Sequence, residues 1–130
     1  VTEENLAQAV DFAKEFAKKT GAVIAITGAI DIVADGEKAY CIYNGHPMMS
    51  SITGTGCQLS AVTAAYVTAN PDTPLEAAAA AVCLMGVCGE KAYKRLTEQD
   101  GNATYRNYII DAIFHLTGDE LEKYAKYDVF

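Results

Sequence analysis

The segment with the clearest chemical potential is Thr53-Gly54-Thr55-Gly56-Cys57, which leads into an Ala-rich stretch from Gln58 to Val67. That stretch predicts a helix, so the glycine segment would lie at a helix N-terminus, where backbone N–H groups are unpaired and the helix dipole is positive. Glycine lets the backbone approach an anion closely and adopt positive φ. We therefore predict an anion-binding loop that can hold a phosphate, or the charge that develops as a phosphoryl group is transferred.

Cys57 lies at the start of this expected helix, where the positive end of the dipole favours a thiolate. A thiolate there can serve as a general base or as a nucleophile. His46, in the loop before the glycine segment, is a candidate partner, although a solvated loop residue is the simpler interpretation. The segment is not a Walker A motif, because no Lys follows its second glycine, and it lacks the third glycine of the dinucleotide fingerprint.

The other three cysteines are Cys41, Cys83 and Cys88, and no two cysteines of the chain form a CxxC pair. The two histidines are not spaced with them as zinc ligands would be, so we predict no protein metal site. We expect these three residues to pack in the core as reduced thiols, which is common for free cysteine.

Composition limits the partners that the chain can have. The formal net charge is -7 over 130 residues. This argues against nucleic acid and anionic membrane surfaces, because both need clustered Lys and Arg. No apolar run approaches the roughly twenty residues that cross a bilayer, and the chain opens on an acidic amphipathic helix rather than a secretion signal. We therefore expect a single cytoplasmic domain with no membrane partner.

Periodicity and turn signals predict an α/β order of elements. An amphipathic helix ended by Gly21 precedes the apolar run 22–26, which predicts a buried central strand. Asp35-Gly36 predicts a hairpin turn between strands, and we expect a mixed sheet with a helix packed on it. Further helices are expected over 58–67, from Pro74 through Cys88 with Thr73 and Glu76 as a capping box, over 105–116 with Gly118 as its end, and over 120–124.

Three strands do not complete a doubly wound sheet, so we infer that the chain is half of a larger fold. Its ordered motifs are Thr27-Gly28, Asp31, Asp35-Gly36, Asn44-Gly45-His46 and Thr53-Gly54-Thr55-Gly56-Cys57. In order and spacing they resemble the pattern of hydroxyethylthiazole kinases, in which the glycine loop ends in Cys, whereas most of the ribokinase-like superfamily has Asp there. The resemblance implies that residues 1–130 are the C-terminal half of a ribokinase-like domain, a three-layer sheet with helices on both faces, whose N-terminal half is absent.

The resemblance also implies a reaction, the ATP-dependent phosphorylation of the hydroxyl of 4-methyl-5-(2-hydroxyethyl)thiazole in thiamine biosynthesis or salvage. Cys57 would accept the hydroxyl proton, while Gly54, Thr55 and Gly56 would form the anion hole for the γ-phosphoryl group. Gly54 would also lie near the thiazole, and Thr27 would contact ATP. Mg²⁺ is implied as a cofactor, and a homotrimer or pairing with the missing N-terminal half as the assembly. That half would carry an Arg for ATP and the acidic residues associated with Mg²⁺.

Two other functions stay open from the sequence. The chain could be a non-catalytic fragment that keeps the half-fold without the chemistry. It could instead be a thiol-nucleophile enzyme in which Cys57 attacks a carbonyl and His46 acts as base. Asp31 and Asp35 are expected to be a strand-edge and a hairpin-turn residue rather than a catalytic pair.

Overall fold

The first helix, α1 (Leu6–Thr20), follows a 3-10 turn, η1 (Glu3–Asn5), in a computed structural model that describes residues 1–130. It ends as expected at Gly21, whose φ of 69° lies in the left-handed region that glycine adopts most readily. The Gly21 N–H donates to the Ala17 carbonyl at 2.8 Å, which satisfies one of the last helical acceptors.

The sheet contains four strands in the order β1-β2-β3-β4, and every neighbouring pair is antiparallel. The strands are β1 (Ile24–Ile26), β2 (Asp31–Ala34), β3 (Ala39–Ile42) and β4 (Tyr127–Val129). Asp35 fixes the turn between β2 and β3, where its Oδ1 accepts the N–H groups of Glu37 and Lys38, both at 2.8 Å. The expected mixed sheet is therefore wrong, and β4 was not expected, because three residues at the end of the chain carry no strand pattern of their own.

The buried central strand expected at 22–26 is not found within this chain, where β1 lies at the edge of the sheet and Ala25 is exposed. A run of apolar residues predicts burial, but it does not say which neighbours supply that burial. Within this chain β1 has one strand neighbour, β2, and is otherwise approached by α1.

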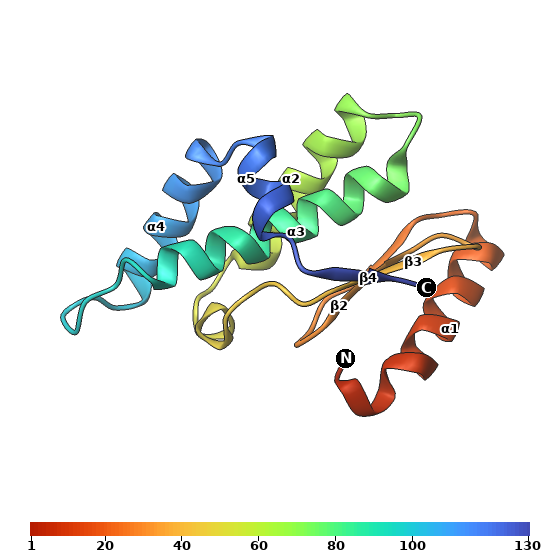
Figure 1. Ribbon diagram of the computed structural model, residues 1–130, viewed down its shortest axis with the longest axis horizontal. Helices are drawn as coiled ribbons and strands as arrows, with labels where there is room; N and C mark the ends of the chain where they lie inside the picture. Colours follow the sequence, from red (N-terminus) through yellow and green to blue (C-terminus); the bar gives the residue numbers. More distant parts are fainter.

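Helices cover both faces of the sheet, as predicted (Figure 1). Alternation along β2 sends Ile32 to the α1 side, where it packs with Val10 and Ala13. Val33 points to the opposite side and packs against α3 (Pro74–Tyr93) at Leu75. The result is an α/β/α arrangement of three layers.

The layer opposite α1 is a helical cluster built around α3, which is buried along most of its length. Its other members are η2 (Pro47–Ser51), α2 (Thr55–Ala69), α4 (Asn102–His115) and α5 (Gly118–Tyr124). Tyr105 of α4 is fully buried and donates its hydroxyl to the Gly89 carbonyl of α3 at 3.0 Å. None of these helices is long and apolar enough to cross a membrane.

One helix boundary and one helix cap differ from expectation. Gly118 does not end α4, which stops at His115, but begins α5 instead, with Thr117 and Glu120 forming its capping box. Thr73 and Pro74 begin α3 as expected, but Thr73 makes no side-chain cap, and Glu76 forms an ion pair with Lys38 at 2.8 Å instead of completing a capping box.

Candidate functional site

The predicted anion-binding loop stands at the start of α2. Gly54 is its N-cap, with a left-handed φ of 98°, and no side chain caps the helix. The first intrahelical bond runs from the Gln58 N–H to the Gly54 carbonyl at 3.0 Å, so the N–H groups of Thr55, Gly56 and Cys57 have no acceptor in the chain. A Cβ at Gly54 or Gly56 would meet no atom within 4 Å. The loop therefore offers three unpaired donors and no crowding at its two glycines, an arrangement that can bind an anion.

This loop forms one side of a cavity of about 570 Å³. The lining also includes the connection between β1 and β2, with Thr27 and Gly28. The structure thus brings together Thr27, Thr55 and Gly56, three of the residues predicted for the site, although 28 positions separate the first two in the sequence. Gly54 and Cys57 belong to the same loop but do not line the cavity.

The wall beside η2 is held by a buried polar cluster centred on Asn44 and Glu90. Asn44 is 5% exposed, and its amide donates to Glu90 Oε1 at 3.1 Å and to the Tyr124 carbonyl at 3.0 Å. Its Oδ1 accepts the N–H of Lys126 at 2.7 Å. Glu90 Oε1 also accepts the N–H of Gly45 at 3.0 Å. These bonds tie the end of β3 to α3 and to the segment before β4.

Burial raises the pKa of Glu90, but the donors Gly45, Lys126 and Asn44 outweigh it and leave the pKa of this carboxyl below its usual range. The ionised form is therefore the one that the fold stabilises. Gly86 allows the close contact of α3 with this cluster, because a Cβ there would lie 2.6 Å from Asn44 Cβ and 2.8 Å from its carbonyl carbon.

His46 lines the cavity, but its ring has a structural role. Its Nδ1 accepts the N–H of Met48 at 3.1 Å and so caps η2. The ring also stacks on Tyr93, with the centroids 3.5 Å apart. A neutral imidazole has one lone pair for accepting a proton, and here that lone pair is occupied. This geometry does not favour His46 as the base of a thiol nucleophile.

Cys57 differs from the other three cysteines in being exposed, whereas Cys41, Cys83 and Cys88 are buried, as predicted. Burial raises the pKa of Cys83 and that of Cys88 to about 11 each. These thiols stay protonated at neutral pH, so Cys57 is the cysteine that solvent and ligands can reach.

Asp31 is a cavity residue whose role the sequence reasoning missed. It is the first residue of β2, and its Oδ1 accepts the N–H of Gly28 at 2.8 Å. Burial raises the pKa of Asp31, against the lowering effects of the Gly28 N–H and the α-amino group of Val1. A signal was present in the sequence, since an Asp side chain can accept a backbone hydrogen bond from the residue three positions before it.

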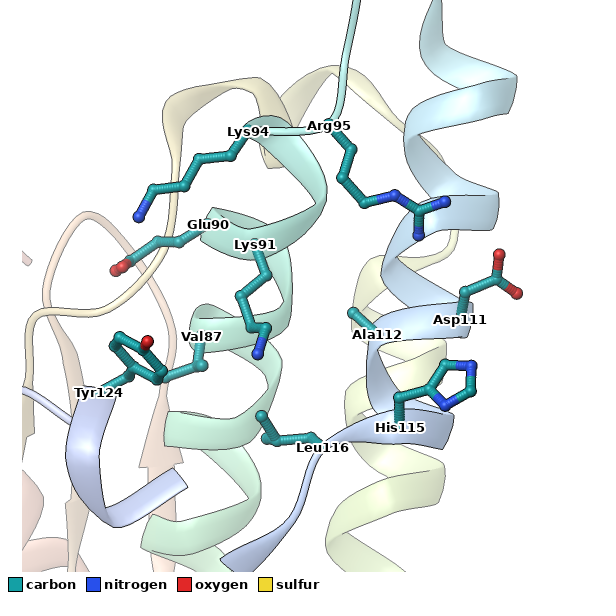
Figure 2. A pocket seen from close by; sticks show the side chains of 10 residues that line it. All are labelled: Val87, Glu90, Lys91, Lys94, Arg95, Asp111, Ala112, His115, Leu116 and Tyr124. Atoms are coloured by element: carbon teal, nitrogen blue, oxygen red, sulfur yellow. The ribbon is translucent and has the colours of Figure 1, made fainter. Parts of the chain in front are cut away.

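A second cavity, of about 360 Å³, lies among α3, α4 and α5. Figure 2 shows Lys91 and Arg95 pointing toward the groove between α3 and α4. Lys91 is paired with Glu120 at 2.6 Å, and the Arg95 guanidinium lies 3.9 Å from the centre of the Tyr108 ring. These charges are largely engaged within the chain, and the cavity has no glycine loop, so it is not the candidate site.

No three His, Cys, Asp or Glu side chains gather where they could hold a metal ion. The cavity beside the glycine loop has no Lys or Arg among its lining residues. An anion bound there would consequently be held by backbone N–H groups rather than by a cationic side chain.

Comparison with known proteins identifies relatives of the whole chain. The model of the hydroxyethylthiazole kinase family matches residues 1–119. A hydroxyethylthiazole kinase of Clostridium acetobutylicum is 61% identical over 130 residues, which is 100% of this chain and 48% of the relative. A hydroxyethylthiazole kinase 2 of Clostridium botulinum (strain Langeland) is 38% identical over 123 residues, covering 95% of this chain and 44% of the relative.

The fold agrees with these sequence relationships. A solved hydroxyethylthiazole kinase structure from Pyrococcus horikoshii OT3 superposes with a TM-score of 0.86 at 30% identity. The match covers 98% of this chain and 48% of that one. The chain therefore spans about half the length of the relatives that it matches.

Proposed function

Because the chain belongs to the hydroxyethylthiazole kinase family, we propose that the protein phosphorylates 4-methyl-5-(2-hydroxyethyl)thiazole with ATP, a step of thiamine biosynthesis or salvage. The observation that carries the proposal is the uncapped start of α2. There, three successive N–H groups are unpaired, and two of them, those of Thr55 and Gly56, belong to residues that line a cavity shared with Thr27. Phosphoryl transfer depends mainly on positioning and on stabilising charge, and a preorganised set of backbone donors supplies the second.

In the proposed reaction the Cys57 thiolate accepts the proton of the substrate hydroxyl. The hydroxyl oxygen forms a bond to the γ-phosphorus as the bond from that phosphorus to the bridging oxygen breaks, and ADP leaves. Gly54, Thr55 and Gly56 form the anion hole for the transferred group, and Gly54 also lies near the thiazole. Thr27, which lines the same cavity, contacts ATP.

Mg²⁺ is the cofactor expected for such a transfer, where it would neutralise phosphate charge. The side chains of this chain do not fit a protein site for it, since no three candidate ligands gather. We therefore assign no step to the metal here.

The proposed domain assignment is that residues 1–130 form the C-terminal half of a ribokinase-like kinase domain. Two observations support it: the chain spans about half of its relatives, and β1 stands at the edge of the sheet with an unpaired side. A homotrimer, or pairing with an N-terminal half, is the proposed assembly, and the cytoplasm is the proposed location.

The proposal is tested by kinase assays on the full-length protein that carries this sequence, with Cys57 replaced by Ala and by Asp. The Ala variant loses the proton acceptor, and we expect kcat to fall by about a hundredfold or more, as is typical for loss of a general base. The Asp variant should keep substantial activity, because a carboxylate can accept the same proton.

Thr68→Ala is the matched control, since Thr68 is also exposed and lies near the other end of α2. It should leave kcat unchanged. Unaltered turnover in Cys57→Ala would show that Cys57 is not the base. If the unmodified protein lacks any ATP-dependent phosphorylation of the thiazole alcohol, the proposed function is wrong and the non-catalytic alternative gains support.

A further inference from the structure

The connection between β1 and β2 is held on each side of Thr27. On one side, Ile26 is the last residue of β1 and pairs with Ile32 in the sheet. On the other side, the N–H of Gly28 donates to Asp31 Oδ1 at 2.8 Å. Thr27 itself makes no side-chain hydrogen bond and is exposed at the cavity. Its position is therefore set by its two neighbours, and Asp31 holds one of them.

A comparison with Asp35, at the other end of β2, shows that Asp31 is not an ordinary turn residue. Asp35 also accepts backbone N–H groups, but there the donors Glu37 and Lys38 lower its pKa. Asp31 instead lines the cavity, makes no ion pair with a Lys or Arg, and lies near Cys83 of α3. The fold thus keeps a carboxylate in a partly buried position that disfavours its charge, where a neutral acceptor could close the same turn.

We propose that Asp31 is a positioning residue for nucleotide binding, which holds the Gly28 N–H and thereby presents Thr27 to ATP. This inference rests on the proposed function, in which Thr27 contacts ATP. Asp31 acts through the backbone of the turn, so its loss should weaken ATP binding while leaving the thiazole alcohol and the chemical step largely unaffected.

The test uses three variants of the full-length protein. Asp31→Ala removes the acceptor, and Asp31→Asn removes the charge but keeps a side-chain oxygen for the Gly28 N–H. Asp35→Ala is the matched control, because it removes two bonds of 2.8 Å from the turn at the opposite end of β2, away from the cavity. ATP affinity is measured by calorimetry, and steady-state kinetics give KM for ATP, KM for the thiazole alcohol and kcat.

We expect Asp31→Ala to raise the ATP Kd and the KM for ATP by about tenfold, the effect of losing one positioning hydrogen bond to a charged acceptor. Asp31→Asn should stay within about twofold of the unmodified protein, because its amide oxygen retains that bond. Asp35→Ala should leave ATP affinity unchanged even if it lowers thermal stability. KM for the thiazole alcohol should not change in any variant.

Circular dichroism first establishes that each variant folds. If Asp31→Ala does not fold, Asp31→Val replaces it, since Val also lacks an acceptor but is favoured in strands. Unchanged ATP affinity in the folded variant without an acceptor overturns the inference. So does an equal loss in Asp31→Asn, which would make the charge, rather than the bond to Gly28, the important property. Failure of the unmodified protein to bind ATP overturns the proposed function itself, and is recognised before any variant is compared.

Discussion

Replacing Gly86 with Ala should destabilise the protein, although alanine is normally the better helix residue. Gly86 lies inside α3, where this exchange would favour folding by about 1 kcal/mol if the helix were free in solution. Here the new Cβ would lie 2.6 Å from Asn44 Cβ, 2.8 Å from its carbonyl carbon and 2.9 Å from its carbonyl oxygen. Two of those atoms are backbone, so rotating a side chain does not relieve the overlap.

The size of the destabilisation follows from the movement of α3 away from the end of β3 that the new Cβ would require. Separating α3 from the end of β3 would lengthen the bonds that Glu90 accepts from Asn44 at 3.1 Å and from Gly45 at 3.0 Å. Overpacking typically costs about 1–3 kcal/mol, and hydrogen bonds to a charged group contribute about 1.5–3 kcal/mol each when fully lost. With these bonds partly lost and the helix-propensity gain subtracted, we expect a net loss of about 2–4 kcal/mol.

Urea unfolding followed by circular dichroism measures this loss as a lower midpoint with an unchanged slope. Gly118→Ala is the matched control, because Gly118 also lies in a helix but a Cβ there meets no atom within 4 Å. That variant should be neutral or slightly more stable. A Gly86→Ala protein as stable as Gly118→Ala would refute the reasoning, since it would mean that α3 and β3 can separate at no cost.

Two further outcomes follow from the titratable groups. Because the pKa of Glu90 is held below its ordinary value of 4.5, its ionised form contributes stability above that pH, and the contribution is lost as pH falls through the folded-state pKa. Glu90→Gln should therefore lower the unfolding free energy by about 1 kcal/mol at pH 7 and by progressively less as the pH is lowered below 4.5. Urea titrations over this pH range measure the difference, and a difference that stays constant would contradict the reasoning. Among the four thiols of residues 1–130, alkylation of the native protein at pH 7.5 should quickly modify that of Cys57 alone, and mass spectrometry should find all four modified in urea. Rapid native modification of Cys83 or Cys88 would contradict their burial.

Local sequence signals accounted for the features that depend on a few adjacent residues. Gly21 ends α1 and Asp35 closes the β2–β3 turn, because each adopts or stabilises a backbone conformation by itself. The glycine segment at Gly54 likewise stands at a helix start as predicted. The ordered motifs also indicated the family and the α/β class, with helices on both faces of a sheet.

The structural features that the sequence did not predict, or predicted incorrectly, involve residues far apart in the chain. The Asn44 amide oxygen meets the Lys126 N–H across 82 positions, and β4 joins the sheet through that same region. The sequence of β4 could not predict this pairing from its own periodicity, because an edge strand of three residues is stabilised by its pairing with β3. The edge position of β1 similarly depended on which strands pair rather than on its own apolar residues.

The sequence by itself determined the chemistry available to this protein: a thiol after a glycine loop, scattered rather than clustered Lys and Arg, and a net negative charge. Only the tertiary structure decided that Thr27 and Thr55 border one cavity, that the lone pair of His46 is occupied, and that Asp31 fixes the turn beside Thr27. The physical reason is the distance along the chain over which each interaction acts. Backbone preferences and helix dipoles act over a few residues, whereas the position of a side chain in a cavity depends on the packing of the sheet and helices together.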